Sequence, residues 1–206
     1  MTTMKAPCAL CTRETTHNIV AVEDRSSEEG RDRYYFLSCA GCGAVSMGNI
    51  WNYSGDEESR YYPSPISRKA PGWLWELSFL GASEEGKLGS LLNEIYQAVQ
   101  GKQYRLAVMG IRAFLEQLMV VKVGDKGTFE KNLDAFLAEG FISKIQKNAM
   151  GHILDSGHAV IHRMHSPNER DLTIALDITE SITAAIFFHE DNAKIVADRA
   201  PPRRKL

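Results

Sequence analysis

The chain has 206 residues, of which 44% are hydrophobic and 24% are charged, and its formal net charge is −2. This composition excludes a mainly disordered chain, and the charge gives no overall sign of a nucleic-acid-binding protein. No apolar run approaches the roughly 18–20 residues of a membrane span, and the N-terminus lacks a signal-peptide pattern, so the expected location is the cytoplasm.

Residues 1–52 are predicted to form a small β module. Alternating apolar residues in three stretches, 17–22, 34–37 and 44–51, are typical of short strands. The polar run EDRSSEEGRD lies between the first two stretches and fits the tip of a hairpin. The module carries five basic and six acidic residues, a balance that does not favour contacts with phosphate.

All four cysteines lie in this module, in two Cys-x-x-Cys pairs that end at residue 42. Two intervening residues let a tight turn aim both sulfurs at one point, and Gly43 follows the second pair, where such a turn often needs a positive φ. A redox dithiol would open a helix after a strand, and neither pair does so. In a reducing compartment this pattern indicates a metal site rather than disulfides.

We therefore predict one structural Zn²⁺ per chain, bound by Cys8, Cys11, Cys39 and Cys42 in a zinc ribbon. Four cysteine ligands leave no position for water or substrate, so the expected role of the metal is to hold the fold together. No other cofactor is predicted.

Residues 53–74 are expected to form a connector. Prolines at positions 63, 65 and 71 favour an extended path over a regular helix. Aromatic residues at positions 61, 62, 73 and 75 suggest that this connector lies on a surface.

Residues 75–198 are predicted to form a bundle of about five helices, followed by a basic tail at 199–206. Ser83 and Thr128 are candidate caps, and the segment 103–123 is apolar nearly all round, as expected of a central helix. A capping box from Ser166 to Glu169 is predicted to open the last helix. The predicted fold class is thus α+β, with a small N-terminal β zinc ribbon followed by a mainly α-helical bundle.

Two sets of polar residues stand out inside the predicted bundle. Arg112 and Glu116 lie four residues apart on the apolar helix, where they either form an ion pair or direct Arg112 at a site shared with another helix. His158, His162 and His165 form one helical stripe. Such a stripe suits metal binding, acid–base chemistry or pH sensing, and it equally suits an interaction with the helix dipole.

The segments LAVMGIRAFLE at 106–116 and GHAVIH at 157–162 resemble the helical family catalogued as domain of unknown function 4145. Tyr62-Pro63 and the segment 71–73 are similar to a connector in that family, whose members often carry an N-terminal zinc ribbon. The family is found in bacteria and in phage and mobile-element contexts. The resemblance covers nearly the whole chain.

The family is thought to be related to the HEPN domains, some of which are dimeric ribonucleases, so the resemblance implies a homodimer. Those ribonucleases use an arginine followed about four to six residues later by a histidine. Neither His162 nor His165 has an arginine at that spacing. His158 also stands where the family usually has asparagine, and Ile161 where it usually has alanine.

The leading hypothesis is a non-enzymatic accessory or interaction module of a bacterial or phage defence system, with a protein or nucleic-acid partner and no membrane. The alternative is a metal-independent ribonuclease or nucleotide-processing enzyme. Its candidate catalytic residues are Arg112, Glu116, His158 and His162. A transcription regulator that reads DNA through the ribbon is a third hypothesis, which the acidic balance of the module disfavours.

Overall fold

The computed structural model describes residues 2–26, 30–53, 56–64 and 68–199. The chain divides into two compact units, which we call the sheet unit, Met1–Lys69, and the helical unit, Ala70–Leu206. Strands fill the first unit and helices the second, so the α+β class is confirmed. The basic tail predicted for 199–206 lies outside the described residues except for Arg199.

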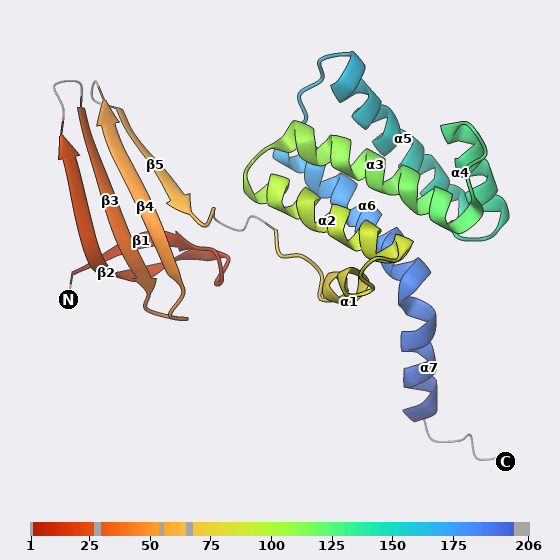
Figure 1. Cartoon of the computed structure of the whole chain (residues 1–206), viewed down its shortest axis with the longest axis horizontal. Coiled ribbons are helices and arrows are strands. Elements are labelled where there is room, and N and C mark those ends of the chain that lie inside the picture. The colour runs from red at the N-terminus through yellow and green to blue at the C-terminus, as the bar shows by residue number, and fades with distance from the viewer. Residues whose placement is uncertain (1, 27–29, 54–55, 65–67, 200–206) are drawn as a thin grey trace. The chain divides into compact units, whose positions relative to one another are not determined.

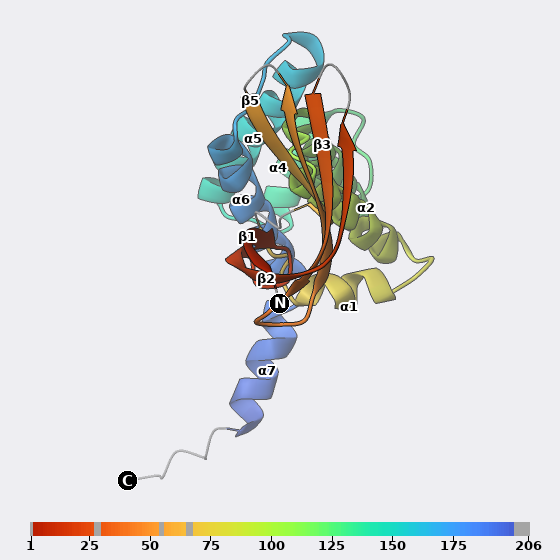
Figure 2. The ribbon, with the colours of Figure 1, turned by 90° about the vertical axis from the view of Figure 1, so that its left-hand side faces the viewer.

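The sheet unit contains one antiparallel sheet in which each strand pairs with the next along the chain (Figure 1). Its strands are β1 (Thr3–Cys8), β2 (Arg13–Ser26), β3 (Gly30–Cys39), β4 (Val45–Tyr53) and β5 (Asp56–Tyr62). The long strands β2 and β3 curve along their length (Figure 2).

Strand β5 lies within the segment 53–74, where the sequence predicted only an extended connector. The sheet therefore continues beyond residue 52. An extended path with a proline at its end suits an edge strand, because Pro63 follows Tyr62 and removes a backbone donor just where pairing stops.

Neighbouring residues on β3 face opposite sides of the sheet. Leu37 is fully buried, whereas Phe36 is 48% exposed, and we name the two sides the Leu37 face and the Phe36 face. Directly paired residues share a face. Because Ser46 pairs with Leu37, and His17 pairs with Cys39, both polar residues lie on the Leu37 face.

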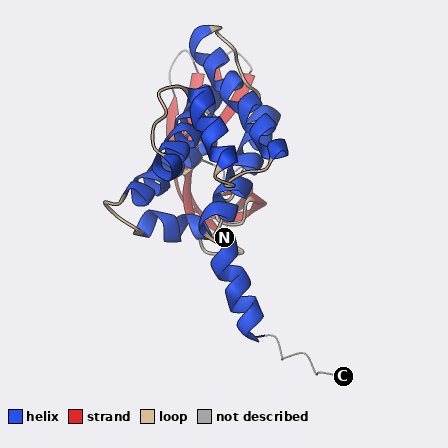
Figure 3. Ribbon diagram, turned by 90° about the vertical axis from the view of Figure 1, so that its right-hand side faces the viewer, coloured by secondary structure: helices blue, strands red, loops and turns tan. Residues whose placement is uncertain are grey.

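Seven helices follow within the described residues (Figure 3). They are α1 (Trp73–Phe79), α2 (Glu84–Gln100), α3 (Tyr104–Val123), α4 (Phe129–Ala138), α5 (Lys144–His162), α6 (Glu169–Phe187) and α7 (His189–Arg199). The sequence predicted about five, because it missed α1 and because the long last helix breaks at Phe188. Helix α7 extends away from the other helices and buries none of its residues (Figure 1).

The described helices include no single one that is long and apolar enough to cross a membrane. Helices α6 and α7 reach the length and apolar composition of a membrane span only when they are taken together, and the chain bends by 59° between them.

Side-chain caps fix where several helices begin. Ser83 and Thr128 accept hydrogen bonds from backbone N–H groups of the first turn, as predicted. The capping box predicted at Ser166 is wrong. Asn168 caps α6 instead, because its side chain and that of Asp171 each accept a hydrogen bond, both of 3.0 Å, from the other's backbone N–H.

Helix α3 is the central element of the helical unit, as its apolar composition predicted. It packs against α2, α4, α5 and α6. Ile111, Phe114, Leu115, Leu118 and Met119 are all fully buried on it. Each large apolar side chain buried in this way stabilises the fold by roughly 1.5–3 kcal/mol.

Replacing Gly157 by alanine is expected to lower the free energy of unfolding of the helical unit by roughly 1–3 kcal/mol. A Cβ atom at this position would lie 2.8 Å from Cβ and 3.0 Å from Cδ of Arg112, so α5 would have to move away from α3. Urea unfolding followed by circular dichroism at the helical band measures the change.

Gly151→Ala is the matched control, because it makes the same substitution in the same helix. A Cβ atom there meets nothing within 4 Å, so this variant is expected to be more stable by up to ~1 kcal/mol through helix propensity. Equal stabilisation by both substitutions would contradict the close approach of α3 and α5 at Gly157.

Candidate metal centre

Two turns of the same construction carry the four cysteines. In the first, the N–H of Thr12 donates to the carbonyl of Cys8 at 2.9 Å, and Thr12 has a φ of 55°. In the second, the N–H of Gly43 donates to the carbonyl of Cys39 at 2.9 Å, and Gly43 has a φ of 75°. The sequence predicted a positive φ at Gly43, after the second pair of cysteines. The structure has a positive φ after both pairs, and in the first turn the residue is Thr12.

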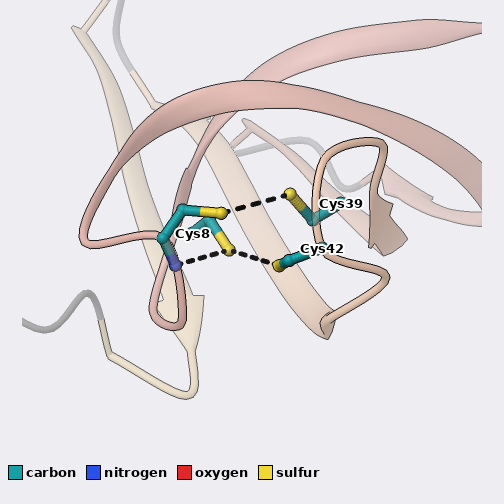
Figure 4. Close-up of side chains that lie close together, drawn as sticks. Cys8, Cys39 and Cys42 are labelled. Atoms are coloured by element: carbon teal, nitrogen blue, oxygen red, sulfur yellow. Dashed lines mark hydrogen bonds between the residues drawn. The ribbon is translucent and has the colours of Figure 1, made fainter.

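The sheet brings these two turns together, because each joins two neighbouring strands at the same end of the sheet. The sulfur atoms of Cys8 and Cys42 are 3.6 Å apart, and those of Cys11 and Cys39 are 4.0 Å apart. In Figure 4 the side chains of Cys8, Cys39 and Cys42 point from opposite turns toward a common centre. All four sulfurs lie within 4.8 Å of one another, and no disulfide joins them.

This sulfur arrangement fits a tetrahedral metal ion. Four sulfurs at about 2.3 Å from a central zinc would be roughly 3.8 Å apart, and the Cys8–Cys42 and Cys11–Cys39 separations lie on either side of that value. The four cysteines can therefore hold a metal ion, and they would fill every position of a four-coordinate site.

Hydrogen bonds shift the pKa values of two of the cysteine thiols in opposite directions. The Thr15 hydroxyl, 3.3 Å from Sγ of Cys39, and the backbone N–H groups of Cys42 and Gly41 lower the pKa of Cys39 to about 5. Hydrogen bonds with Cys42 and Cys8 raise the pKa of Cys11 to about 12. These opposite shifts favour the thiolate form at Cys39 and the thiol form at Cys11, and binding of a metal ion requires Cys11 to lose its proton.

The sequence did not indicate that Thr15 and Thr12 belong to this centre. Thr15 lies two residues before His17 on β2, and the pairing of β2 with β3 brings it beside the sulfur of Cys39. The sequence showed only that Thr15 stands two residues before His17, the spacing of residues on one face of a strand. The identity of its sulfur neighbour depended on strand register, which the sequence did not specify.

Arg112 contacts residues of its own helix and of two neighbouring helices. Its guanidinium forms an ion pair with Glu116 at 2.7 Å and donates to the carbonyl oxygen of Leu154 at 2.6 Å. It also lies 5.6 Å from the ring centroid of Phe129. These contacts join α3 to α4 and α5, and they leave only 20% of the arginine side chain exposed.

The candidate histidines lie on α5 and just beyond its end. The rings of His158 and His162 are 4.4 Å apart, and both residues are exposed, as is His165 beyond the end of the helix. Within the described parts of the chain, no hydrogen bond or ion pair links Arg112 or Glu116 to a histidine. Among the four candidate catalytic residues, the structure shows two direct contacts, Arg112 with Glu116 and His158 with His162.

Comparison with known proteins identifies the family of the helical unit. The family model described as domain of unknown function (DUF4145) matches residues 93–199, from the middle of α2 to the end of α7. No curated protein and no solved structure matches the chain. The match covers more than half of the 206 residues, and the chain therefore belongs to the DUF4145 family.

Proposed function

We propose that this protein is a non-catalytic interaction module, in which one structural Zn²⁺ shapes the sheet and the Phe36 face binds a partner protein. The observation that carries the proposal is a row of exposed apolar side chains across three strands. Phe36, Met47 and Tyr62 are paired side by side, and they are 48%, 38% and 45% exposed.

Zinc is the metal that the donor set favours. Four thiolates in a tetrahedron are the usual ligands of a structural zinc, and the site has no open position for a substrate. The role of the metal is to fix the ends of β1, β2, β3 and β4, because two of its ligands lie at the β1–β2 connection and two at the β3–β4 connection. It supplies no chemistry beyond this.

The row on the Phe36 face has the character of a protein interface. Val45 extends it by one more apolar residue, 53% exposed and two positions before Met47 on β4. Soluble proteins rarely expose contiguous apolar surface unless it binds something. Aromatic residues and methionine are enriched in protein interfaces, and this row contains both kinds.

The remainder of this face is less suited to nucleic acid. The guanidinium of Arg25 lies over the ring of Tyr34, and that of Arg60 lies over the ring of Trp51. Those two rings are therefore not free to stack on bases. The strand pairing also places three acidic residues on the same face, Glu23, Asp32 and Glu58. Mixed charge around an apolar row matches a polypeptide better than a phosphate backbone.

We extend the proposal to a homodimer formed through the helical unit, with a second copy of this chain as the occupant. Trp75 and Phe79 stack on each other on α1 with ring centroids 5.3 Å apart, and they are 68% and 76% exposed. Two such rings in contact with water favour burial against another copy. The setting expected from the family resemblance, a bacterial or phage defence system, belongs to the same proposal.

The full chain purified without chelator is expected to contain one zinc per molecule. A strong chelator, or the substitution Cys39→Ser, should remove the metal and unfold the sheet unit, because zinc binding to such sites supplies roughly 10–16 kcal/mol of folding free energy. Metal analysis and NMR of the strand amides measure both effects. The double variant His158→Ala, His162→Ala should keep its zinc, and loss of zinc from it would contradict the assignment to the cysteines.

Peptides selected on the full chain from a random displayed library are expected to be rich in apolar residues. Phe36→Ala should weaken their binding at least tenfold, because a central aromatic anchor is typically worth more than 1.4 kcal/mol. Fluorescence anisotropy measures the affinities. Phe79→Ala is the matched control and should leave binding unchanged. Tighter binding of polyuridine RNA, or its cleavage, would overturn the choice of a protein partner.

Analytical ultracentrifugation is expected to show a dimer of the full chain. The double variant Trp75→Ser, Phe79→Ser should sediment as a monomer at the same concentration, because it removes the exposed rings without touching a buried side chain. Phe36→Ser should remain a dimer. A wild-type chain that stays monomeric at high concentration would disprove this part of the proposal.

A further inference from the structure

His158 and His162 form a pair of neighbouring rings on the surface of α5. They are four residues apart, and residues at this spacing lie on the same side of a helix. Their ring centroids are 4.4 Å apart and their ring planes are inclined by 40°. Both residues are exposed, so the two rings are accessible to a ligand from solution.

The surroundings of the pair leave its ring nitrogens available. In the described parts of the chain, neither imidazole takes part in a hydrogen bond or an ion pair. The nearest charged residues along the chain, Asp155 and Arg163, bind each other at 2.6 Å. Helix α5 ends at His162, and the partial negative charge at the C-terminal end of a helix favours a cation bound there.

A pair of this kind suits a transition-metal ion. Imidazole is the side chain that most often binds such ions, through the lone pair of one ring nitrogen. Two histidines one turn apart on a helix can offer two nitrogens to the same ion. Mg²⁺ and Ca²⁺ prefer oxygen ligands, so the donor set selects against them.

The separation of the rings agrees with two ligands of one metal ion. A nitrogen that binds zinc or a similar ion at roughly 2.0–2.1 Å places the centre of its ring about 3.2 Å from the metal. Two such rings would have centres about 4.5 Å apart at an angle of about 90° around the metal, and about 5.2 Å apart at about 109°. The observed 4.4 Å matches the smaller angle, which is typical of the square-planar and tetragonal sites of Cu²⁺ and Ni²⁺.

The direction of the nitrogens does not restrict this fit. The Cβ–Cγ bond of a histidine points at the centre of its ring, so rotation about this bond redirects the nitrogens and leaves the ring centre almost in place. Exposed side chains make such rotations within nanoseconds. Each ring can therefore turn one nitrogen toward a common point at the observed separation.

We propose that His158 and His162 bind one divalent transition-metal ion, Ni²⁺ or Cu²⁺, through one nitrogen each. Among the described residues, only the cysteine cluster brings three or more metal-binding side chains together, so this second site has two protein ligands. Its other positions are open to water or to a ligand from another molecule, in contrast to the closed cysteine site. The inference depends neither on the Phe36 face nor on the zinc.

The test uses the untagged, zinc-loaded full chain after dialysis. Ni²⁺ is titrated while calorimetry measures the affinity and NMR follows the backbone amides and the histidine rings. One Ni²⁺ is expected to bind per chain and to change the signals of the last two turns of α5, whereas Mg²⁺ should leave them unchanged. No binding of Ni²⁺, or binding that changes only signals elsewhere, would overturn the proposal.

Variants of two exposed histidines on the same helix test the ligands. His162→Ala should weaken Ni²⁺ binding by about tenfold or more, because it removes one of two ligands. His152→Ala is the matched control, since His152 is exposed on α5 and has no histidine one turn away, and it should bind Ni²⁺ as the unaltered chain does. Equal weakening by both substitutions, or by neither, would contradict the site.

Zn²⁺ tests the coordination angle. Zinc prefers a tetrahedral arrangement, so it is expected to bind the histidine pair more weakly than Ni²⁺ does. Two imidazoles also hold zinc less tightly than four thiolates, so the expectation of one zinc per purified molecule is unchanged. Zn²⁺ binding to the pair as tightly as Ni²⁺ would refute the assignment to Ni²⁺ or Cu²⁺.

Discussion

The sheet unit depends on the cluster of four cysteines, whose sulfur atoms all lie within 4.8 Å of one another. Cys8 and Cys42 are 34 residues apart in the chain, yet their sulfurs almost touch. Four thiols packed this closely do not ionise together unless a cation offsets their charge, and the opposite pKa shifts of Cys39 and Cys11 reflect that. The turns that carry these cysteines join β1 to β2 and β3 to β4, and residues of both turns line a neighbouring cavity.

The helical unit is organised differently, around the close packing of α3 against α5. Gly157 leaves room for the side chain of Arg112, and Arg112 then binds the carbonyl of Leu154 and the carboxylate of Glu116. A charge that is mostly buried needs such partners. Arg112 therefore has a packing role, because it joins α3 to α5.

The sequence predicted some elements well because their signals are local. The Cys-x-x-Cys spacing, the apolar length of α3 and the cap at Ser83 each depend on residues of one continuous segment of the chain. Strand β5 was missed because an edge strand exists only by pairing with β4. The start of α6 was misplaced because Ser166 and Asn168 are both good caps, and only the reciprocal bonds with Asp171 select the second.

By itself, the sequence determined that this protein has two Cys-x-x-Cys pairs that can hold a metal ion, followed by a helical domain, since ligand spacing and helical periodicity depend on residues that are close in the chain. Only the tertiary structure decided which side chains share a surface. A shift of one residue in strand pairing would exchange the Phe36 and Leu37 faces, so the apolar row and the burial of His17 both depend on register. Register is set by contacts between distant strands, and these place His17 and Ser46 on the same face of the sheet.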